Sequence, residues 1–471
     1  MATITSSPRP APAAAADRSR HWAPLAVVLA GTSMAVLDFF IVNVALPAMQ
    51  RSLHAGGSAI EWVAAGYALT TAVLLIASGR LGDRFGRRRM FSAGLGLFTL
   101  ASATCGLAPN SATLITGRLL QGFGGALMGT NVLSLIGVIY SDAADRAKAM
   151  AAYATVMGFA AVAGQLIGGA LLQLDPFGLG WRSCFLINLP VGVLAIIAAR
   201  RFVPESRGSA TSIDLPGIAL ITATLTALVL PLVEGQQLGW PLWCWISLAM
   251  VPPLTTAFAL QQRRVHRGGM LPLLDRALLM LPGFRAGLVA QLLFWCGQAS
   301  FFLILALFLQ QGHGLSPLAA GGMFTTLALP YVVTSMRAPE LTARYGRNVV
   351  TAAALTLVSG HLVLIATVAL GGSGGSVLAL LPGLGLVGIG MGLGIAPLTG
   401  GLMAALRPEQ AGAASGALTT AQYVGSAIGV ALVGIAYFGG LSSGFTAAFE
   451  HGLWVLVGAL TLVAVLSRRL P

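Results

Sequence analysis

Apolar segments of about 20 residues recur along the whole chain and are separated by short polar connections, as in helices that cross a bilayer. The pattern predicts fourteen such spans, at 24–46, 62–79, 90–108, 112–138, 149–172, 183–199, 215–233, 241–260, 286–310, 317–336, 349–370, 377–402, 412–436 and 447–466. This leaves about 34 residues for each span with its connection, so there is no room for a soluble catalytic domain. The chain is therefore predicted to be an all-α polytopic membrane protein.

Basic residues are confined almost entirely to one side of this predicted arrangement. If the N-terminus is cytoplasmic, every Lys and Arg except Arg51, Arg118 and Arg182 lies in a cytoplasmic segment. Because cytoplasmic loops carry an excess of Lys and Arg, both termini are predicted to be cytoplasmic. The net charge of +13 therefore indicates membrane orientation and not nucleic-acid binding. Composition agrees, because 9% of the residues are charged against about 25% in soluble proteins.

Composition shifts divide the chain into five parts. Residues 1–22 are rich in Ala, Pro and Ser and are predicted to form a disordered cytoplasmic tail. Residues 23–200 then form an N-terminal half of six helices, and residues 201–262 form two extra spans. The longest polar stretch between spans, 263–285, is predicted to be a cytoplasmic linker, and residues 286–467 form a C-terminal half of six helices.

An internal repeat supports two related halves. The loop 79–87 and the loop 339–347 share Leu, Arg, an aromatic residue, Gly and Arg at the same spacing. Each loop follows the second span of a six-span set. Parallel repeats of six spans are a known transporter architecture, so the sequence predicts two halves of one design.

The loop 79–89 carries the pattern Gly-x-x-x-Asp-Arg-x-Gly-Arg-Arg, and there the chain resembles the major facilitator superfamily, specifically its fourteen-span drug:proton antiporters. Residues 37–47, Leu-Asp-Phe-Phe-Ile-Val-Asn-Val-Ala-Leu-Pro, are similar to the first-span motif of that branch. The resemblance implies the major facilitator fold, with two six-helix halves and two extra central helices. A tight turn permitted by Gly, with an Asp and several Arg, suits a charge network beneath the helix ends. The residues of this predicted gate motif are Gly79, Asp83, Arg84, Gly86, Arg87 and Arg88.

Asp38 and Arg118 are the only formal charges deep inside the predicted spans. At the helical rise, both lie about 21 Å from the inner face of the bilayer. Two opposite charges at one depth, each costly alone, are expected to pair or to share a watery cavity. The segment 118–126 also resembles the family's fourth-span motif, through Arg118, Gln121 and Gly122. The resemblance implies that Asp38 and Arg118 couple transport to protons, and a static structural ion pair is the alternative.

The fifth-span motif of the antiporters is incomplete in this chain. The family pattern is Gly-x-x-x-Gly-Pro-x-x-Gly-Gly, and this chain keeps Gly164, Gly168 and Gly169 but has Gln165 in place of the Pro. The small residues still permit close helix packing. Gln165 either contributes a polar group to a cavity or forms a hydrogen bond between helices.

Several polar and aromatic residues in the spans are candidates for a substrate cavity, because binding sites combine apolar walls with a few polar groups. His361 lies near the middle of a span, where a neutral His bonded to a neighbouring helix is the alternative. For the others, ordinary helix packing is the alternative. The candidates are Asn43, Gln165, Gln291, Trp295, Gln298, Phe301, His361 and Gln422.

The sequence predicts a transporter and not an enzyme. It contains no P-loop, no HExxH pattern and no grouping of nucleophile and base, so neither ATP nor a catalytic centre is indicated. The four cysteines lie far apart and do not indicate a metal site. We expect proton-coupled export of small amphipathic drugs or antibiotics across a bacterial cytoplasmic membrane, by a monomer without a cofactor. A transporter of the same fold with another solute or direction is the alternative.

Overall fold

The computed structural model describes residues 18–140, 142–207, 214–235, 238–268, 272–273, 276–371, 375–404 and 411–470. The described residues form long helices joined by short connections. The first half contains α1 (Arg18–Leu53), α2 (Gly57–Phe85), α3 (Arg87–Gly106), α4 (Ser111–Ile139), α5 (Ala143–Leu174), α6 (Ser183–Leu186) and α7 (Asn188–Phe202). Next come α8 (Leu215–Glu234), α9 (Leu242–Arg267) and the short α10 (Arg276–Met280). The second half contains α11 (Pro282–Leu307), α12 (Pro317–Tyr345), α13 (Asn348–Gly371), α14 (Leu381–Ala404), α15 (Ala411–Gly440) and α16 (Phe445–Ser467).

Every predicted span falls on one of these helices, with α6 and α7 sharing the segment 183–199. Among the described residues, twelve helical segments are long and apolar enough to cross a membrane. Helices α3 and α5 are not among the twelve. Helix α3 opens with three consecutive arginines, and the apolar stretch found in α5 is the shorter segment Ala163–Leu174. The chain is therefore a multi-pass membrane protein.

The limits of two predicted segments differ in the structure. Helix α1 begins at Arg18, inside the segment 1–22 that was expected to be a disordered tail, and residues 1–17 lie outside the described part. Helix α9 continues to Arg267, and α10 lies inside the segment expected to be a linker. Helices of membrane proteins extend beyond the bilayer core, so hydropathy alone places their ends short of the true ones.

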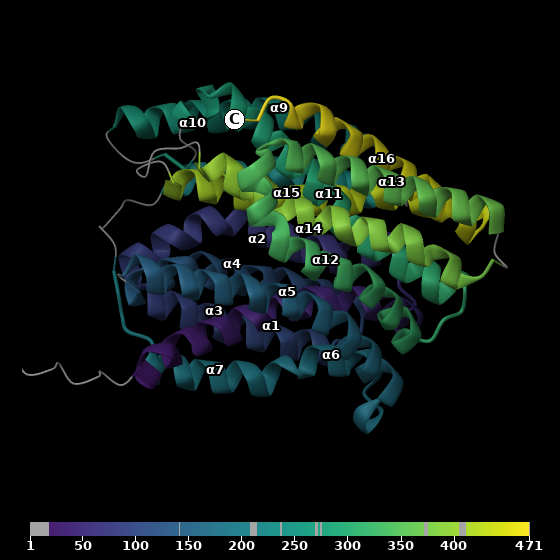
Figure 1. The fold of residues 1–471 in the computed structure, drawn as a ribbon, viewed down its shortest axis with the longest axis horizontal. Helices are drawn as coiled ribbons and strands as arrows, with labels where there is room; N and C mark the ends of the chain where they lie inside the picture. Colours follow the sequence, from purple (N-terminus) through teal and green to yellow (C-terminus); the bar gives the residue numbers. More distant parts are fainter. Residues whose placement is uncertain are drawn as a thin grey trace, which may run out of the picture.

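The two halves repeat the same helix pairings. In the first half α1 packs on α5 and α2 on α4, and in the second half α11 packs on α15 and α12 on α14. The halves meet through α2 with α15 and through α5 with α12, which is the exchange expected of two related units. Figure 1 shows α1–α7 on one side of the bundle and α11–α16 on the other. The repeat indicated by the two loops thus extends to the helix arrangement.

Helices α8 and α9 pack against each other, and α8 also contacts α2 and α15. The extra pair therefore lies beside the junction of the two halves. The start of α1 and the end of α16 lie at the same end of the bundle, on the left in Figure 1. The loop between α2 and α3 lies at that end too, because α2 runs in the opposite direction to α1. We call this the loop-83 end, after Asp83.

Glycines allow the helices to approach closely. A Cβ atom added at Gly122 of α4 would lie 2.5 Å from the backbone oxygen of Tyr67 in α2. A Cβ atom at Gly429 of α15 would lie 2.1 Å from the backbone oxygen of Cys296 in α11. Only a residue without a side chain fits at such contacts. Close packing of this kind stabilises membrane helices through van der Waals contact, since lipid is as apolar as the side chains.

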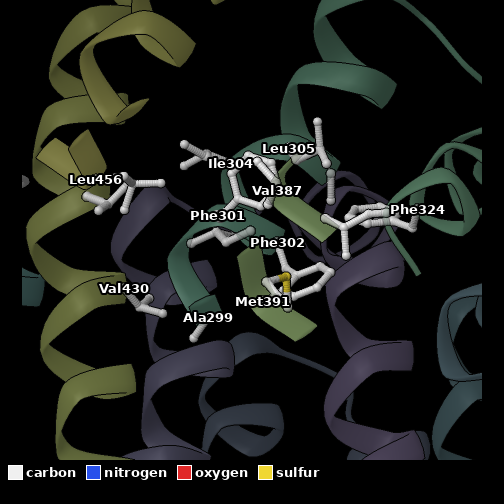
Figure 2. Packing of buried hydrophobic residues seen from close by; sticks show 14 of the residues in the cluster. Ala299, Phe301, Phe302, Ile304, Leu305, Phe324, Val387, Met391, Val430 and Leu456 are labelled. Carbon is white, nitrogen blue, oxygen red and sulfur yellow. The ribbon is translucent and has the colours of Figure 1, made fainter. Parts of the chain in front are cut away.

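Helix α11 passes through the apolar core of the second half. The side chains from Phe301 to Leu309 are all buried. Figure 2 shows Phe301, Phe302 and Leu305 surrounded by side chains of α12, α14, α15 and α16, among them Phe324 and Met391. A helical segment that is buried on all sides has a continuous apolar sequence, as residues 301–309 do.

Candidate functional site

Asp38 and Arg118 form a buried ion pair between α1 and α4. The Arg118 Nη1 atom donates to Asp38 Oδ2 at 2.7 Å. The exposed fractions are 0% for Asp38 and 1% for Arg118. A charge removed from water is tolerated where a partner and further hydrogen bonds compensate it. The structure therefore brings together the two charges that the sequence placed at one depth.

The other contacts of the Asp38 carboxylate are also with donors. Its Oδ1 atom accepts from Gln121 Nε2 at 3.1 Å and from Asn188 Nδ2 at 2.7 Å. Both amides also donate to Ser102 Oγ, which in turn donates to the backbone oxygen of Phe98. Each amide hydrogen thus has an acceptor, and both carboxylate oxygens accept. The arrangement fits an ionised Asp38, because a carboxyl proton would meet donors on every side.

Arg118 is held by groups from three helices. Its Nε atom donates to the backbone oxygen of Val63 in α2 at 2.8 Å, and Nη1 also donates to Gln121 Oε1 at 2.8 Å. The guanidinium group lies over the Tyr67 ring, with Cζ 4.7 Å from the ring centre. A planar guanidinium suits such combined bonding and stacking, and a Lys could not replace it. The guanidinium group of Arg118 therefore ties α1, α2 and α4 together.

Two members of this network were not found from the sequence. Asn188 lies at the start of α7, and Ser102 lies in α3. Both interrupt apolar segments, and a polar side chain inside a span is a signal of helix–helix bonding. A polar residue within an apolar segment does not reveal its bonding partner. Asn188 and its partner Asp38 are 150 residues apart in the chain.

The gate motif caps the ends of α2 and α3. Gly86 has φ 108°, a backbone conformation that favours Gly, and it ends α2 and precedes α3. Within the loop, Arg87 Nη2 donates to Asp83 Oδ1 at 2.8 Å. Arg84 stacks on the neighbouring Phe85 ring. A Cβ atom added at Gly79, the first residue of the motif, would have no atom of the described residues within 4 Å. The charge network expected beneath the helix ends is therefore present, and its role as a gate stays a prediction.

Glu205, which follows α7, completes this network and was missed by the sequence analysis. Its Oε1 atom accepts from the backbone N–H of Arg88 at 3.1 Å, and its carboxylate faces the guanidinium groups of Arg88 and Arg89. The backbone N–H of Arg87 also donates to the Ser206 oxygen at 2.8 Å. A carboxylate at the start of a helix is stabilised by the free backbone N–H groups there. The loop between α2 and α3 is thereby fixed to the end of α7.

The fifth-span residues pack α5 against both halves. A Cβ atom at Gly164 would lie 2.8 Å from the Leu37 oxygen, next to Asp38 in α1. Gly168 faces Ile41 of α1, and Gly169 faces Pro317 at the start of α12. The Gln165 side chain is 3% exposed. Neither of its polar atoms has a hydrogen-bond partner among the described residues, so the alternative of a hydrogen bond between helices is not observed there.

A small pocket lies where the two halves meet next to the ion pair. It is lined from the first half by Asn43, Arg118 and Ala68, and from the second half by Ala299 and Ser426, with further apolar side chains around them. Residues four apart share a helix face, so Gln291 and Trp295 lie on the same face of α11 as Ala299, and Gln298 is adjacent. Gln422 lies one turn before Ser426 on α15.

His361 and Phe301 lie apart from this pocket. Their rings contact each other edge to face at 5.0 Å, between α13 and α11. The His361 Nδ1 atom bonds the Leu357 oxygen of its own helix at 2.6 Å, and not a neighbouring helix as the alternative interpretation expected. Gln291 donates to Thr399 on α14, with its Oε1 atom unpartnered among the described residues. The candidates therefore divide into a central group and a peripheral pair.

The repeated halves and the buried ion pair define an integral membrane transporter. The chain belongs to the Major Facilitator Superfamily, whose family profile matches residues 28–430. The predicted family is therefore confirmed, and the protein is a transporter and not an enzyme.

Similar proteins include one named as an antibiotic transporter and one named as a multidrug resistance protein. The chain is 37% identical over 436 residues to the "Probable actinorhodin transporter" of Streptomyces coelicolor, covering 92% of this chain and 75% of that protein. It is 34% identical over 412 residues to the "Multidrug resistance protein Stp" of Mycobacterium tuberculosis, covering 86% and 73%. The crystal structure of a D-xylose-proton symporter matches with a TM-score of 0.69 at 15% identity, covering 96% of this chain and 98% of that one. This last likeness shows the fold alone.

Proposed function

We propose that the protein is a proton-coupled antiporter that exports small amphipathic drugs or antibiotics across a bacterial cytoplasmic membrane by alternating access. The buried Asp38–Arg118 pair carries this proposal, since an intramembrane ionisable pair in a transporter is a candidate proton relay. The names of the relatives supply the substrate class. The proton gradient supplies the energy, and no cofactor takes part.

The coupling step is an exchange of partners at Asp38. With Asp38 ionised, Arg118 is held against the carboxylate and α1, α4 and α7 are tied together. A proton on Asp38 removes the negative charge and frees Arg118 from the pair. Because Arg118 also lines the pocket between the halves, its release changes the charge that a bound substrate meets. Proton binding and substrate binding then compete through one guanidinium group, as antiport requires.

The state of this structure is closed at the end remote from Asp83. Two side-chain hydrogen bonds join the two halves there: Gln310 donates to the Val44 oxygen, and Gln311 donates to Gln50, each at 2.8 Å. At the loop-83 end, Asp83 and Glu205 make contacts within the first half, and Arg80 donates to the backbone oxygen of Pro272 in the linker at 2.8 Å. In the opposite state, Asp83 and its neighbouring arginines tie the two halves together at the loop-83 end and act as the inner gate.

The substrate site is the pocket beside Arg118, enlarged in the open state. Asn43, Gln291, Gln298 and Gln422 provide polar groups, and Trp295 provides an apolar wall. Gln165 supports this assignment, since its buried amide has no partner among the described residues and is free to bond a substrate. Among the described residues that line the pocket there is no acidic side chain, and the nearby Asp38 is engaged by Arg118. Neutral or weakly charged amphipathic compounds are therefore favoured over dications.

The membrane topology has fourteen spans, with both termini and the 263–285 linker in the cytoplasm. The spans comprise the twelve apolar helices together with α3 and α5. The excess of Lys and Arg at the loop-83 end supports this orientation. A reporter tag fused after the last residue is protected from external protease in intact cells. A tag that external protease removes would contradict the orientation.

The deciding experiment compares cells that produce the protein with cells that produce the Asp38→Asn variant, across a panel of toxic compounds. Selective protection against amphipathic drugs, lost when the proton gradient is collapsed, supports antiport. Protection against none of the panel favours the second candidate, a transporter of the same fold with another solute or direction. The replacement of the expected fifth-span Pro by Gln165 is the observation that favours this second candidate.

A further inference from the structure

Glu61 of α2 is a buried acid that the proposed coupling step does not use. Its side chain is 3% exposed, although it lies near the end of the helix remote from Asp83. The Oε2 atom has no hydrogen-bond partner among the described residues, and the carboxyl group forms no ion pair there. An ionised carboxylate with an unpartnered oxygen is costly in such a place.

Three parts of the protein meet at this residue. From the second half, α15 presents Gly434 so closely that a Cβ atom there would lie 2.5 Å from Glu61 Cδ. From the extra pair, α8 presents Glu234, whose Oε1 atom accepts from Trp62 Nε1 at 2.6 Å. Helix α4 presents Arg118, which bonds Val63 and is engaged by Asp38. The other titratable group of α15 at this end is Tyr437, one turn beyond Gly434. Glu61 therefore faces the acid Glu234 and the backbone at Gly434. Among the described residues, no cation is free to pair with it.

We propose that Glu61 is a second proton-binding site, protonated while α2 packs against α15 and ionised when these helices separate. The proton comes from the aqueous phase at the end remote from Asp83 and returns to it. A neutral carboxylic acid can pack against Gly434, whereas a carboxylate must be hydrated. Acid on that side therefore stabilises closure of that end. The inference rests on the alternating access of the proposed function.

The two proton sites are connected through one helix. Arg118 bonds the backbone oxygen of Val63, two residues after Glu61. Movement of α2 away from α15 therefore also displaces a group that holds Arg118 against Asp38. Protonation of Glu61 thus favours the position of α2 in which the ion pair between Asp38 and Arg118 is formed.

A cross-link reports whether α2 and α15 are together. A Cβ atom at Gly57 would lie 3.2 Å from Cγ of Phe438, which is close enough for a disulfide between Gly57→Cys and Phe438→Cys. The yield is measured at a series of pH values between about 5 and 9, with and without Glu61→Gln, which mimics the protonated acid. Each yield is divided by that of the Gln variant at the same pH, because thiol oxidation itself depends on pH.

The expected ratio is near one in acid and falls several-fold as the pH rises, because Glu61 then ionises and the helices separate. Glu450→Gln, which removes an acid of α16 at the same end, should leave this fall unchanged. A ratio that stays constant with pH would overturn the proposal. So would loss of the fall in the Glu450→Gln background, because the titrating acid would then be Glu450.

Carbodiimide modification tests the same point on the unaltered chain, should the cysteine pair fail to fold. This reagent attacks carboxylic acids in apolar surroundings, and peptide mass spectrometry locates the product. Modification of Glu61 should be highest in acid and decline as the pH rises. A Glu61 that is unmodified at every pH, or equally modified at every pH, refutes the site. Neither readout uses a drug or a gradient, so failure of this inference is distinguishable from failure of export.

Discussion

Replacing Asp38 by Asn is the sharpest test of proton coupling, because it keeps the shape of the side chain and removes its charge. The two carboxylate oxygens of Asp38 accept from Arg118, Gln121 and Asn188. An Asn offers one oxygen and one N–H₂ group, so in either orientation a donor faces a donor. A buried polar group left without its partner costs about 1–3 kcal/mol.

The larger effect falls on Arg118, which is left as a buried charge without its counter-ion. Removing one partner of a buried ion pair costs about 3–5 kcal/mol. We therefore expect a lower unfolding temperature and a lower amount of protein in the membrane. Transport must be normalised to the protein present for this reason.

The effect on coupling is set by the proton gradient. A difference of one pH unit is worth about 1.36 kcal/mol per proton, a factor of about ten in substrate concentration. With one proton exchanged for each neutral substrate, vesicles with a gradient of about two units should concentrate the substrate roughly a hundredfold. In the Asp38→Asn variant the ratio should fall to about one, because no proton is exchanged at this site.

The assay follows accumulation of a fluorescent or radiolabelled drug in inverted vesicles after an imposed pH jump. Downhill exchange of the same drug measures whether the variant still folds and binds substrate. Asp214→Asn is the matched control, since Asp214 is also a buried acid but caps the first turn of α8. An Asn still caps the helix but sets its amide against the Gln262 donor, so the amount of protein should fall somewhat. Accumulation per molecule should stay full, because neither contact involves Arg118. Asp38→Asn vesicles that still concentrate the drug against its gradient would refute the coupling assignment.

Three further predictions follow from other contacts. Asn188→Leu removes a donor to Asp38, so we expect the free energy of unfolding to fall by about 1–3 kcal/mol and proton-driven accumulation to weaken. A variant equal to wild type in thermal unfolding and accumulation would exclude Asn188 from the network. Asp83→Asn removes the negative charge that pairs with Arg87 and should reduce the transport rate while the amount in the membrane, measured by immunoblot, is unchanged. The Val side chain of Gly122→Val overlaps the α2 backbone and should lower the free energy of unfolding by about 1–3 kcal/mol. As a control, Gly79→Ala should be tolerated, since no described atom lies within 4 Å of the added Cβ. Equal melting temperatures of these two variants would contradict the close approach of α2 and α4.

The sequence by itself determined the class of the protein. Its apolar segments repeat at the length of a bilayer-crossing helix, because the hydrocarbon core accepts only segments whose backbone groups are bonded internally. The uneven distribution of Lys and Arg predicted an orientation, and the loop 79–89 indicated the superfamily that the comparison confirmed. Asp38 and Arg118 could be paired because each is costly alone and both lie at one depth.

The tertiary structure decided which helices face one another. Hydropathy reports whether a segment lies in lipid, and it does not specify which helix lies next to which. For this reason Asn188 and Glu205 escaped notice, although one completes the Asp38 network and the other fixes the loop between α2 and α3. The same limit applies to His361, which the sequence placed at mid-span but could not place outside the central pocket.

Glu61 shows the difference most clearly. It directly precedes the predicted span 62–79, and hydropathy alone places such a residue at the outer edge of the membrane, where a charged side chain is hydrated. In the folded chain, α15 brings Gly434 against its carboxyl group and leaves it buried. Position along a helix gives depth in the bilayer, whereas burial depends on the neighbour opposite, and that neighbour is about 370 residues further along the chain. Only the packing of the two halves turns an ordinary helix-end acid into a candidate proton site.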